Sequence, residues 1–154
     1  MFEIRQRDGL ARIGRLTTPH GELTTPTLLP VVNPRKLTLG PAEIRDCGAT
    51  GLITNSYIIS RHAELREPAL ADGVHALVGW DGPLMTDSGT FQSHVYGDIE
   101  VEPQAILEFQ RDIGSDIGTV LDVFTEPEFD AEQAEAELMK TQARIEAAIP
   151  LKGE

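Results

Sequence analysis

The sequence predicts an α/β fold with parallel strands. Short apolar runs typical of buried strands occur at residues 51–54, 83–86 and 117–121. Segments with the start and stop residues of helices lie between these runs. Because strands and helices alternate along the chain, the strands are expected to run parallel and to be joined by helical crossovers.

Length and composition are those of a globular domain. The chain has 154 residues, 40% of them hydrophobic, which corresponds to one domain or to part of a larger one. No apolar run approaches the ~20 residues needed to cross a bilayer, and the amino terminus lacks the pattern of a signal peptide. Cys47 is the single cysteine, which excludes an internal disulfide and fits a reducing compartment. We therefore expect a cytoplasmic protein that does not contact membranes.

The chain is strongly acidic, with a formal net charge of −12. Proteins that bind nucleic acids normally contact phosphates through a basic surface, so this charge argues against such a partner without excluding one. Many acidic residues and few lysines also match an adaptation to high salt, in which repulsion between like charges is screened within ~3 Å at 1 M ionic strength.

The first thirty residues are expected to form a β-hairpin and one further strand. Residues 2–7 and 10–16 are compatible with strands, and Asp8-Gly9 between them is a strong hairpin signal. A polar turn at residues 18–21 leads to an apolar run at 25–32. This run is bounded by prolines and predicts a strand that enters the α/β layer.

Helices are expected at 41–47, at 101–113 and, as two short pieces around Glu67-Pro68, within 58–79. The clearest helix spans 131–149. Its start and end are marked by residues typical of helix termini: Asp130 as the cap, Gln133 at capping-box spacing and Pro150 after the last turn. Its apolar residues Leu138, Ile145 and Ile149 fall on one face, and that face is expected to be buried.

Two layouts fit this order of elements, an open doubly wound sheet and a portion of a (β/α)8 barrel. A complete barrel needs about 250 residues, whereas this chain supplies about four strand–helix units. No glycine-rich phosphate fingerprint follows the first strand, which counts against a dinucleotide-binding fold.

Polar side chains follow three of the predicted strands, namely Asn55, Asp87 and Asp122. In a barrel all three would point to the face at the carboxyl ends of the strands, where barrel active sites lie. One acid can act on a reacting carbon or proton while the other accepts hydrogen bonds from an N–H pair, such as N1–H and NH₂ of guanine. Phe91 can stack on a planar base.

Each of these residues also has a purely structural interpretation. Asp-Ser-Gly at residues 87–89 is a common turn sequence, and Asp122 can cap the turn that follows it. Asn55 can form an Asx turn, and Phe91 can belong to the core. Spacing alone leaves these alternatives open.

The sequence TDSGTFQ at residues 86–92 resembles the signature loop of the tRNA-guanine transglycosylases. The resemblance extends to residues 30–34, 51–57 and 115–122, in order, and covers essentially the whole chain. Residues 2–16 and 30–34 are more similar to the archaeal branch of the family, and strong acidity would suit an archaeon that lives in high salt.

The resemblance implies a fold, a reaction and partners. The fold is the N-terminal half of a (β/α)8 TIM barrel preceded by a β-hairpin, with residues 1–154 as a partial catalytic domain. The reaction replaces guanine at position 15 of the tRNA D-loop with 7-cyano-7-deazaguanine, a step toward archaeosine, through a covalent enzyme–ribose intermediate. The partners are tRNA and the exchanged bases, and the base must leave the stack to react.

The resemblance also implies roles for residues. Asp87 is the catalytic aspartate, as nucleophile or as general acid/base, and Asp122 reads the guanine edge. Ser88 and Gln92 add polar contacts, Phe91 the stacking face, and Asn55 lines the pocket beside Asp87.

Other features of the family fall outside residues 1–154. They are a zinc site of Cys and His residues, a second aspartate, a glycine-rich loop and a C-terminal RNA-binding extension. The histidines lack metal-ligand spacing, so we expect no metal or cofactor in this chain; they are His20, His62, His75 and His94.

We therefore expect the isolated chain to be inactive. It should also be prone to association, because half a barrel leaves strand edges unpaired. Its partner would be a second copy or a complementing C-terminal half. Two alternatives remain: a non-catalytic or split-gene subunit that completes a barrel with a partner chain, and an unrelated α/β enzyme that uses Asp87 and Asp122 as an acid/base pair.

Overall fold

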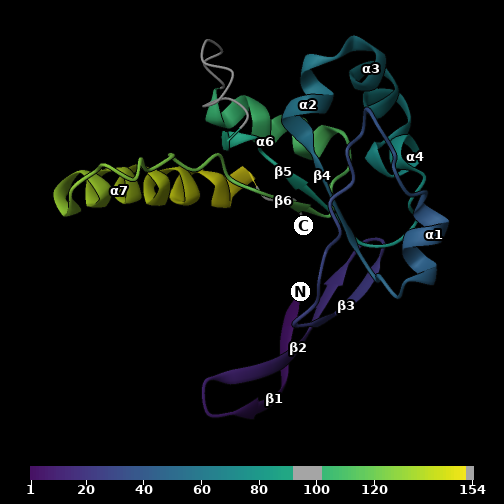
Figure 1. Ribbon diagram of the computed structural model, residues 1–154, viewed down its shortest axis with the longest axis horizontal. Helices are drawn as coiled ribbons and strands as arrows, with labels where there is room; N and C mark the ends of the chain where they lie inside the picture. The colour runs from purple at the N-terminus through teal and green to yellow at the C-terminus, as the bar shows by residue number, and fades with distance from the viewer. Residues whose placement is uncertain (92–101, 152–154) are drawn as a thin grey trace.

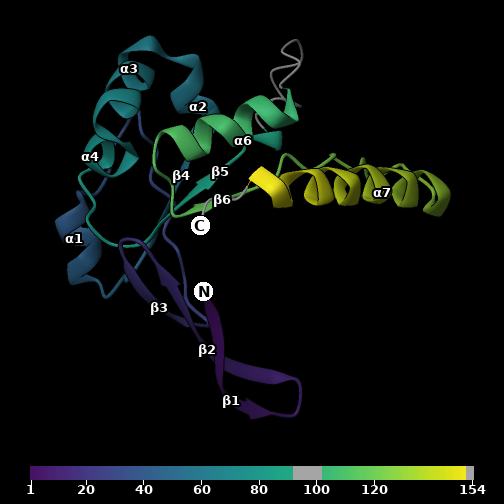
Figure 2. The same ribbon diagram turned by 180° about the vertical axis from the view of Figure 1, so that it is seen from behind.

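The computed structural model describes residues 1–91 and 102–151, which form two three-stranded sheets with surrounding helices. The first sheet is antiparallel and the second is parallel, and helices pack around the second (Figure 1). The antiparallel sheet projects from one end of this body and the last long helix from its side, as the reverse view also shows (Figure 2). The predicted α/β class is confirmed.

The strands are β1 (Phe2–Asp8), β2 (Ala11–Thr18) and β3 (Gly21–Thr25) in the first sheet, and β4 (Leu52–Asn55), β5 (Leu84–Asp87) and β6 (Ile117–Gly118) in the second.

The antiparallel sheet contains the predicted hairpin and one strand that was not predicted. β1 and β2 pair from Phe2↔Leu16 to Asp8↔Ala11, and β3 follows β2 directly after a tight turn. The prediction of a strand at 25–32 was wrong, since this segment makes only an isolated parallel bridge to β4. Pro26 and Pro30 within the segment have no N–H to donate, which prevents a continuous ladder.

The parallel sheet has the order β4-β5-β6, which follows the sequence. In register, Ile53 lies beside Met85 and Met85 beside Ile117. These three side chains point to one face of the sheet and are only half-buried. Leu52 and Leu84 point to the other face and are buried, so the helices cover one face of the sheet. The strand expected at 117–121 is shorter than predicted.

Six helices are described: α1 (Pro41–Asp46), α2 (Ser56–Arg61), α3 (Ala63–Asp72), α4 (Val74–Val78), α6 (Pro103–Asp112) and α7 (Ala131–Ala148), followed by a 3-10 turn, η1 (Ile149–Leu151). The predicted break at Glu67-Pro68 was wrong, because α3 continues through Pro68. The breaks lie instead at His62, whose backbone is extended, and at Gly73, whose φ of 88° favours glycine. Within the described residues, none of these helices has the length and apolar content that a membrane span requires.

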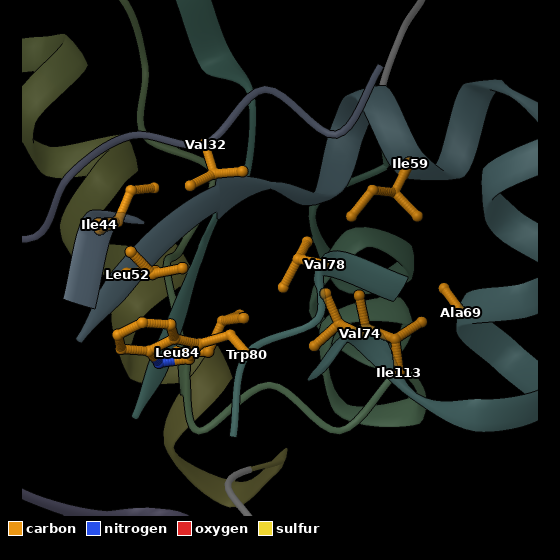
Figure 3. Close-up of a cluster of buried hydrophobic side chains, with 10 residues drawn as sticks. All are labelled: Val32, Ile44, Leu52, Ile59, Ala69, Val74, Val78, Trp80, Leu84 and Ile113. Atoms are coloured by element: carbon orange, nitrogen blue, oxygen red, sulfur yellow. The ribbon is translucent and has the colours of Figure 1, made fainter. Parts of the chain in front are cut away.

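One hydrophobic core lies between the parallel sheet and helices α1 to α4 (Figure 3). Trp80 is 3% exposed, and its indole N–H donates to the carbonyl oxygen of Pro83 at 3.1 Å, so its polar atom is satisfied inside the core. The core unites residues of β4 and β5 with residues from the segments before β4, between β4 and β5, and between β5 and β6. Its buried members are Val32, Ile44, Leu52, Ile59, Ala69, Val74, Val78, Trp80, Leu84 and Ile113.

Helix α7 begins with the predicted capping box. Asp130 Oδ1 accepts from the N–H of Gln133 at 2.9 Å, and Gln133 Oε1 accepts from the N–H of Asp130 at 3.0 Å. The expectation of a buried apolar face was wrong: Leu138, Ile145 and Ile149 are 54%, 46% and 64% exposed. The half-buried face of α7 instead carries small residues and polar residues. They are Ala134, Glu137, Thr141, Arg144 and Ala148.

Candidate active site

Asn55 and Asp87 meet at the carboxyl ends of two adjacent parallel strands. They are register partners in β4 and β5, and Asn55 Nδ2 donates to Asp87 Oδ2 at 2.9 Å. Asn55 Oδ1 accepts from the N–H of Ile58 at 2.8 Å, so the same side chain caps α2. Asn55 is therefore both the cap of α2, where the alternative interpretation placed an Asx turn, and a neighbour of Asp87.

Asp87 is held by neutral hydrogen-bond donors on both sides. Its Oδ1 accepts from the N–H of Gly89 at 3.0 Å, and its main-chain oxygen accepts from Ser56 Oγ at 2.7 Å. In residues 1–91 and 102–151, no lysine or arginine forms an ion pair with this half-buried carboxylate. These hydrogen bonds fix the side chain of Asp87, and in the described residues no salt bridge compensates its negative charge.

The loop after β5 is bonded to the segment after β6. The N–H of Ser88 donates to Thr119 Oγ1 at 2.7 Å, and Ser88 Oγ donates to the carbonyl oxygen of Val120 at 3.1 Å. Thr90 Oγ1 donates to the carbonyl oxygen of Asp122 at 3.3 Å. These bonds bring the segment of Asp122 alongside the loop of Asp87, and the Asp122 side chain is exposed there. Ser88 is 1% exposed.

Arg144 of α7 supports Asp122 from the other side. Its Nη1 donates to the carbonyl oxygens of Leu121 at 2.8 Å and of Asp122 at 3.2 Å. Thr141 Oγ1 accepts from the N–H of Val123 at 2.9 Å. The polar face of α7 thus fixes the backbone on which Asp122 stands.

Two aromatic rings border the same region. Phe91 is 58% exposed, so the interpretation of Phe91 as a core residue was wrong. Its ring lies 6.1 Å, centroid to centroid, from that of Phe124, with an angle of 54° between the rings. Phe124 was not predicted, although its position two residues after Asp122 was a usable signal. Gln92, also predicted to belong to the site, lies outside the described residues.

A hollow of about 210 Å³ opens beside Asp87. Its walls are mainly apolar, and the polar residues Asn33, Thr54, Asn55 and Asp87 also line it. Ile53, which belongs to the half-buried face of the parallel sheet, borders the hollow as well. The apolar part of its lining is formed by Val31, Val32, Ile53 and Ile58.

A second polar cluster lies at the opposite, amino-terminal end of the parallel strands. Asp116 accepts from His20 Nδ1 at 2.9 Å, from His75 Nε2 at 3.1 Å and from the N–H of Leu84 at 2.9 Å. The Asp116 side chain has no exposed surface, and the two imidazole rings stack with centroids 3.6 Å apart. The sequence spacing gave no sign of this cluster, which borders a hollow of about 610 Å³.

The described residues do not fit the zinc site of Cys and His that the family resemblance implies. Cys47 is exposed and is the single cysteine, and the donor atoms of His20, His75 and Asp116 include no thiolate. Those three donors lie within 4.8 Å of one another. In the present geometry the carboxylate of Asp116 lies within hydrogen-bond distance of both imidazoles and of the N–H of Leu84, so the three residues form a hydrogen-bonded group.

His75 makes the stability of this cluster dependent on pH. Burial and the neighbouring charge of His20 lower the pKa of His75 below its ordinary value of 6.5, and they outweigh the opposing effect of Asp116. An unfolded chain therefore takes up the proton more readily than the folded one. The stability contributed by neutral His75 is present above pH 6.5 and is lost as the pH falls below that value.

We accordingly expect a lower unfolding temperature at pH 5.5 than at pH 7.5, and a smaller difference in the variant His75→Gln. Thermal unfolding followed by circular dichroism at both pH values measures this. His62→Gln is the matched control, because His62 is partly exposed and lies outside the cluster. An unchanged pH dependence in His75→Gln would contradict the prediction.

Comparisons with known proteins match this chain to one family. A family model described as "TGT: Queuine tRNA-ribosyltransferase" matches residues 7–153. The chain is similar to the tRNA-guanine(15) transglycosylase of Thermoplasma acidophilum, with 54% identity over 144 residues, which are 94% of this chain and 23% of that protein. The enzymes of the same name from Methanosarcina barkeri and Haloarcula marismortui are each 53% identical over 96% of this chain and over 30% and 31% of their own lengths. The chain thus spans about a quarter to a third of the length of these curated relatives.

Proposed function

The chain belongs to the queuine tRNA-ribosyltransferase family, and we propose that it carries part of the active site of a tRNA-guanine(15) transglycosylase. The proposed reaction exchanges guanine at position 15 of the tRNA D-loop for 7-cyano-7-deazaguanine. The observation that carries the proposal is the carboxylate of Asp87, fixed by Asn55 and Gly89 beside a hollow at the carboxyl ends of the strands. Membership of the family removes the alternative of an unrelated α/β enzyme.

Asp87 has two chemical roles open to it in this exchange. As nucleophile, its carboxylate oxygen attacks C1′ of the ribose while the C1′–N9 bond breaks and its electrons leave with guanine. The incoming base then displaces the carboxylate from C1′ and loses the proton on its N9. As general acid/base, Asp87 instead gives a proton to the leaving guanine and takes one from the incoming base.

Asp122 is proposed to recognise the base. A carboxylate only accepts hydrogen bonds, which suits N1–H and the exocyclic NH₂ of guanine. The exposed ring of Phe91 offers a stacking surface, and Phe124 extends it beside Asp122. Gln92 and Ser88 are proposed as further polar contacts. The hydroxyl hydrogen of Ser88 is directed to Val120, so Ser88 would accept rather than donate.

The hollow beside Asp87 is proposed to hold the ribose. The reacting C1′ has to lie against the carboxylate, so the sugar must occupy the space next to it. Apolar walls suit the carbon face of a ribose, and the polar atoms of Asn33 and Asn55 suit its hydroxyl groups. The base would then lie toward Asp122 and the aromatic rings.

Residues 1–154 are proposed to form part of a (β/α)8 barrel. The support is the sequential order of the parallel strands and the coverage of one sheet face by helices. The half-buried row of Ile53, Met85 and Ile117 on the other face suits the layered interior of a barrel, with Asn55 and Asp87 next to it at the carboxyl end. A complementing half or a second copy of the chain would cover this face.

The proposal is tested in a chimera in which this chain replaces the corresponding segment of the Haloarcula marismortui relative. We expect the chimera to exchange radiolabelled guanine into tRNA at position 15 and to incorporate 7-cyano-7-deazaguanine there. A folded chimera without exchange would refute the proposed function. The isolated chain is the second sample, and we expect it to be inactive and to associate, which size-exclusion chromatography measures.

The role of Asp122 is tested in the same chimera with Asp122→Asn. The amide replaces one of the two acceptor oxygens of Asp122 with a donor NH₂. We therefore expect the KM for guanine to rise about 10-fold or more, in line with the 10–100-fold cost of one or two unpaired hydrogen bonds. An unchanged KM for guanine would remove Asp122 from base recognition. Glu108→Gln is the control, since Glu108 lies on α6 and, among the described residues, its side chain bonds to Gln104.

A further inference from the structure

Gln110 is a buried polar residue of α6 whose side chain reaches the ends of β5 and β6. It is 2% exposed. Its Oε1 accepts from Thr86 Oγ1 at 2.8 Å and from the N–H of Thr119 at 3.0 Å. Its Nε2 donates to the carbonyl oxygen of Thr119 at 2.9 Å. A helix side chain thus bridges the two strands at the last bond of their ladder.

The amide of Gln110 binds Thr119 as a second peptide group would. It bonds to both the N–H and the C=O of that residue, which is the pairing that two neighbouring strands make. An amide side chain offers both the donor and the acceptor that this arrangement needs. The register of β6 with β5 ends at Thr86↔Gly118, and the N–H of Thr119 still donates to the carbonyl oxygen of Thr86 at 3.2 Å. Gln110 shares this N–H and supplies the donor for the carbonyl oxygen of Thr119.

The bonds of Gln110 lead to both acids of the candidate site. Thr86 precedes Asp87 directly. Thr119 Oγ1 accepts from the N–H of Ser88, the residue after Asp87, at 2.7 Å. Thr119 also begins the segment that carries Asp122. Beyond the backbone bond from Thr119 to Thr86, the bonds from this segment to the loop of Asp87 that follow involve the side chains of Ser88 and Thr90. Gln110 therefore bonds to the residue before Asp87 and to the start of the segment of Asp122.

We infer that Gln110 is a positioning residue that fixes the separation between Asp87 and Asp122. The inference rests on the proposed function, in which one acid acts at the ribose and the other holds the base. If that separation changes, a base held by Asp122 no longer places its C1′–N9 bond against Asp87. A misplacement of about 1 Å can lower the rate of an enzyme about 100-fold.

The decisive variant is Gln110→Met, which keeps the length of the side chain and removes both its donor and its acceptor. The carbonyl oxygen of Thr119 then loses its donor, and Thr86 Oγ1 loses one acceptor. In the chimera we expect kcat for guanine exchange to fall about 10- to 100-fold, while the KM for tRNA changes less than about 3-fold. Gln104→Met is the matched control, because Gln104 lies exposed on the same helix and, within residues 1–91 and 102–151, bonds to Glu108.

A double-mutant cycle separates positioning from a merely structural role. If Gln110 acts through the placement of Asp122, Gln110→Met should cost much less in an Asp122→Asn chimera than in the parent, because the placed group is already lost. Additive losses would overturn the inference, as would a kcat equal to that of Gln104→Met. The parent chimera is measured first, so a failure of the proposed function appears as absent exchange before any Gln110 variant is compared.

Hydrogen exchange gives a second readout that does not depend on activity. In the 154-residue chain, the variant Gln110→Leu removes one of the two acceptors of the Thr119 N–H and loosens Thr119, whose Oγ1 protects the amide of Ser88. The exchange rates of both amides should rise about 10-fold or more, the factor expected when roughly 1.4 kcal/mol of local protection is lost. The amide of Ile58, which Asn55 protects, should keep its rate. Equal rates at Thr119 and Ser88 in wild type and Gln110→Leu would overturn the inference even if the chimera shows no exchange.

Discussion

Replacing Asp87 with asparagine is expected to lower the rate of guanine exchange in the chimera by a factor of about 10²–10⁴, the range that a positioned acid or base contributes. The amide oxygen of the new side chain would still accept hydrogen bonds, so the bonds to Asn55 or Gly89 are kept in part and the fold is preserved. What is lost is the carboxylate that attacks C1′ or carries the proton. Exchange of radiolabelled guanine into tRNA measures the effect.

Two further measurements show whether the loss of exchange is specific to Asp87 and which role Asp87 has. Asp112→Asn is the matched control, because Asp112 is an exposed acid at the end of α6 that pairs with Arg111 in the described part of the chain, and it should exchange guanine at the parent rate. Exchange by Asp87→Asn within about 5-fold of that rate would exclude a catalytic role, since it falls below the contribution of a general acid or base. Isolation of a covalent tRNA adduct on a peptide containing Asp87 distinguishes the nucleophile from the acid/base role.

The second large effect is expected for Gly89→Ala. Gly89 has a φ of 84°, and a Cβ at this position would lie 2.2 Å from Cβ of Tyr57. Tyr57 is 5% exposed and cannot move aside without disturbing α2. The conformation costs an alanine about 1–2 kcal/mol, and overpacking typically adds about 1–3 kcal/mol. We therefore expect a loss of about 2–5 kcal/mol in the free energy of unfolding.

Gly114→Ala separates these two contributions. Gly114 ends α6 with a φ of 74°, and a Cβ there would have nothing within 4 Å, so only the backbone cost applies. Urea denaturation of both variants should give a difference of at least about 1 kcal/mol between them, the lower limit of the overpacking cost. Equal losses would mean that the contact between Gly89 and Tyr57 does not constrain the loop.

The effect of Gly89→Ala also bears on the site. Tyr57 follows Ser56, which holds the main-chain oxygen of Asp87, and Asn55, which holds its carboxylate. A displaced Tyr57 would shift both donors. Gly89→Ala should therefore lower guanine exchange in the chimera even under conditions in which the variant is fully folded.

The parts of the fold that were predicted correctly rest on local signals. Asp130 and Gln133 are three residues apart, and the capping box they form is visible in the sequence. The meeting of Asn55 and Asp87 followed from one rule, that parallel strands present their carboxyl ends at the same edge. The loop at residues 86–92 was assigned by resemblance, since spacing alone left Asp87 open to interpretation as a turn residue.

The parts that failed depend on contacts between distant segments. The local sequence does not distinguish Gln110 from other helix residues. Its role depends on Thr119 and Thr86, which only the fold brings into contact with it. The apolar face of α7 was expected to be buried because periodicity shows which residues share a face, whereas it does not show which face meets the rest of the chain. In this chain that face is the one with Thr141 and Arg144.

The cluster of His20, His75 and Asp116 has a consequence for the order in which the chain acquires its structure during synthesis. The antiparallel sheet closes through near neighbours, such as Met1 with Thr17, so it can form soon after it leaves the ribosome. The bond from His20 to Asp116 spans 96 residues. At translation rates of ~5–20 residues per second, Asp116 follows His20 by roughly 5–20 s. During that interval the antiparallel sheet is complete but lacks this bond to the parallel sheet. Residues 26–40 connect the two sheets, and nascent-chain proteolysis should cleave this segment until Asp116 has emerged from the ribosome.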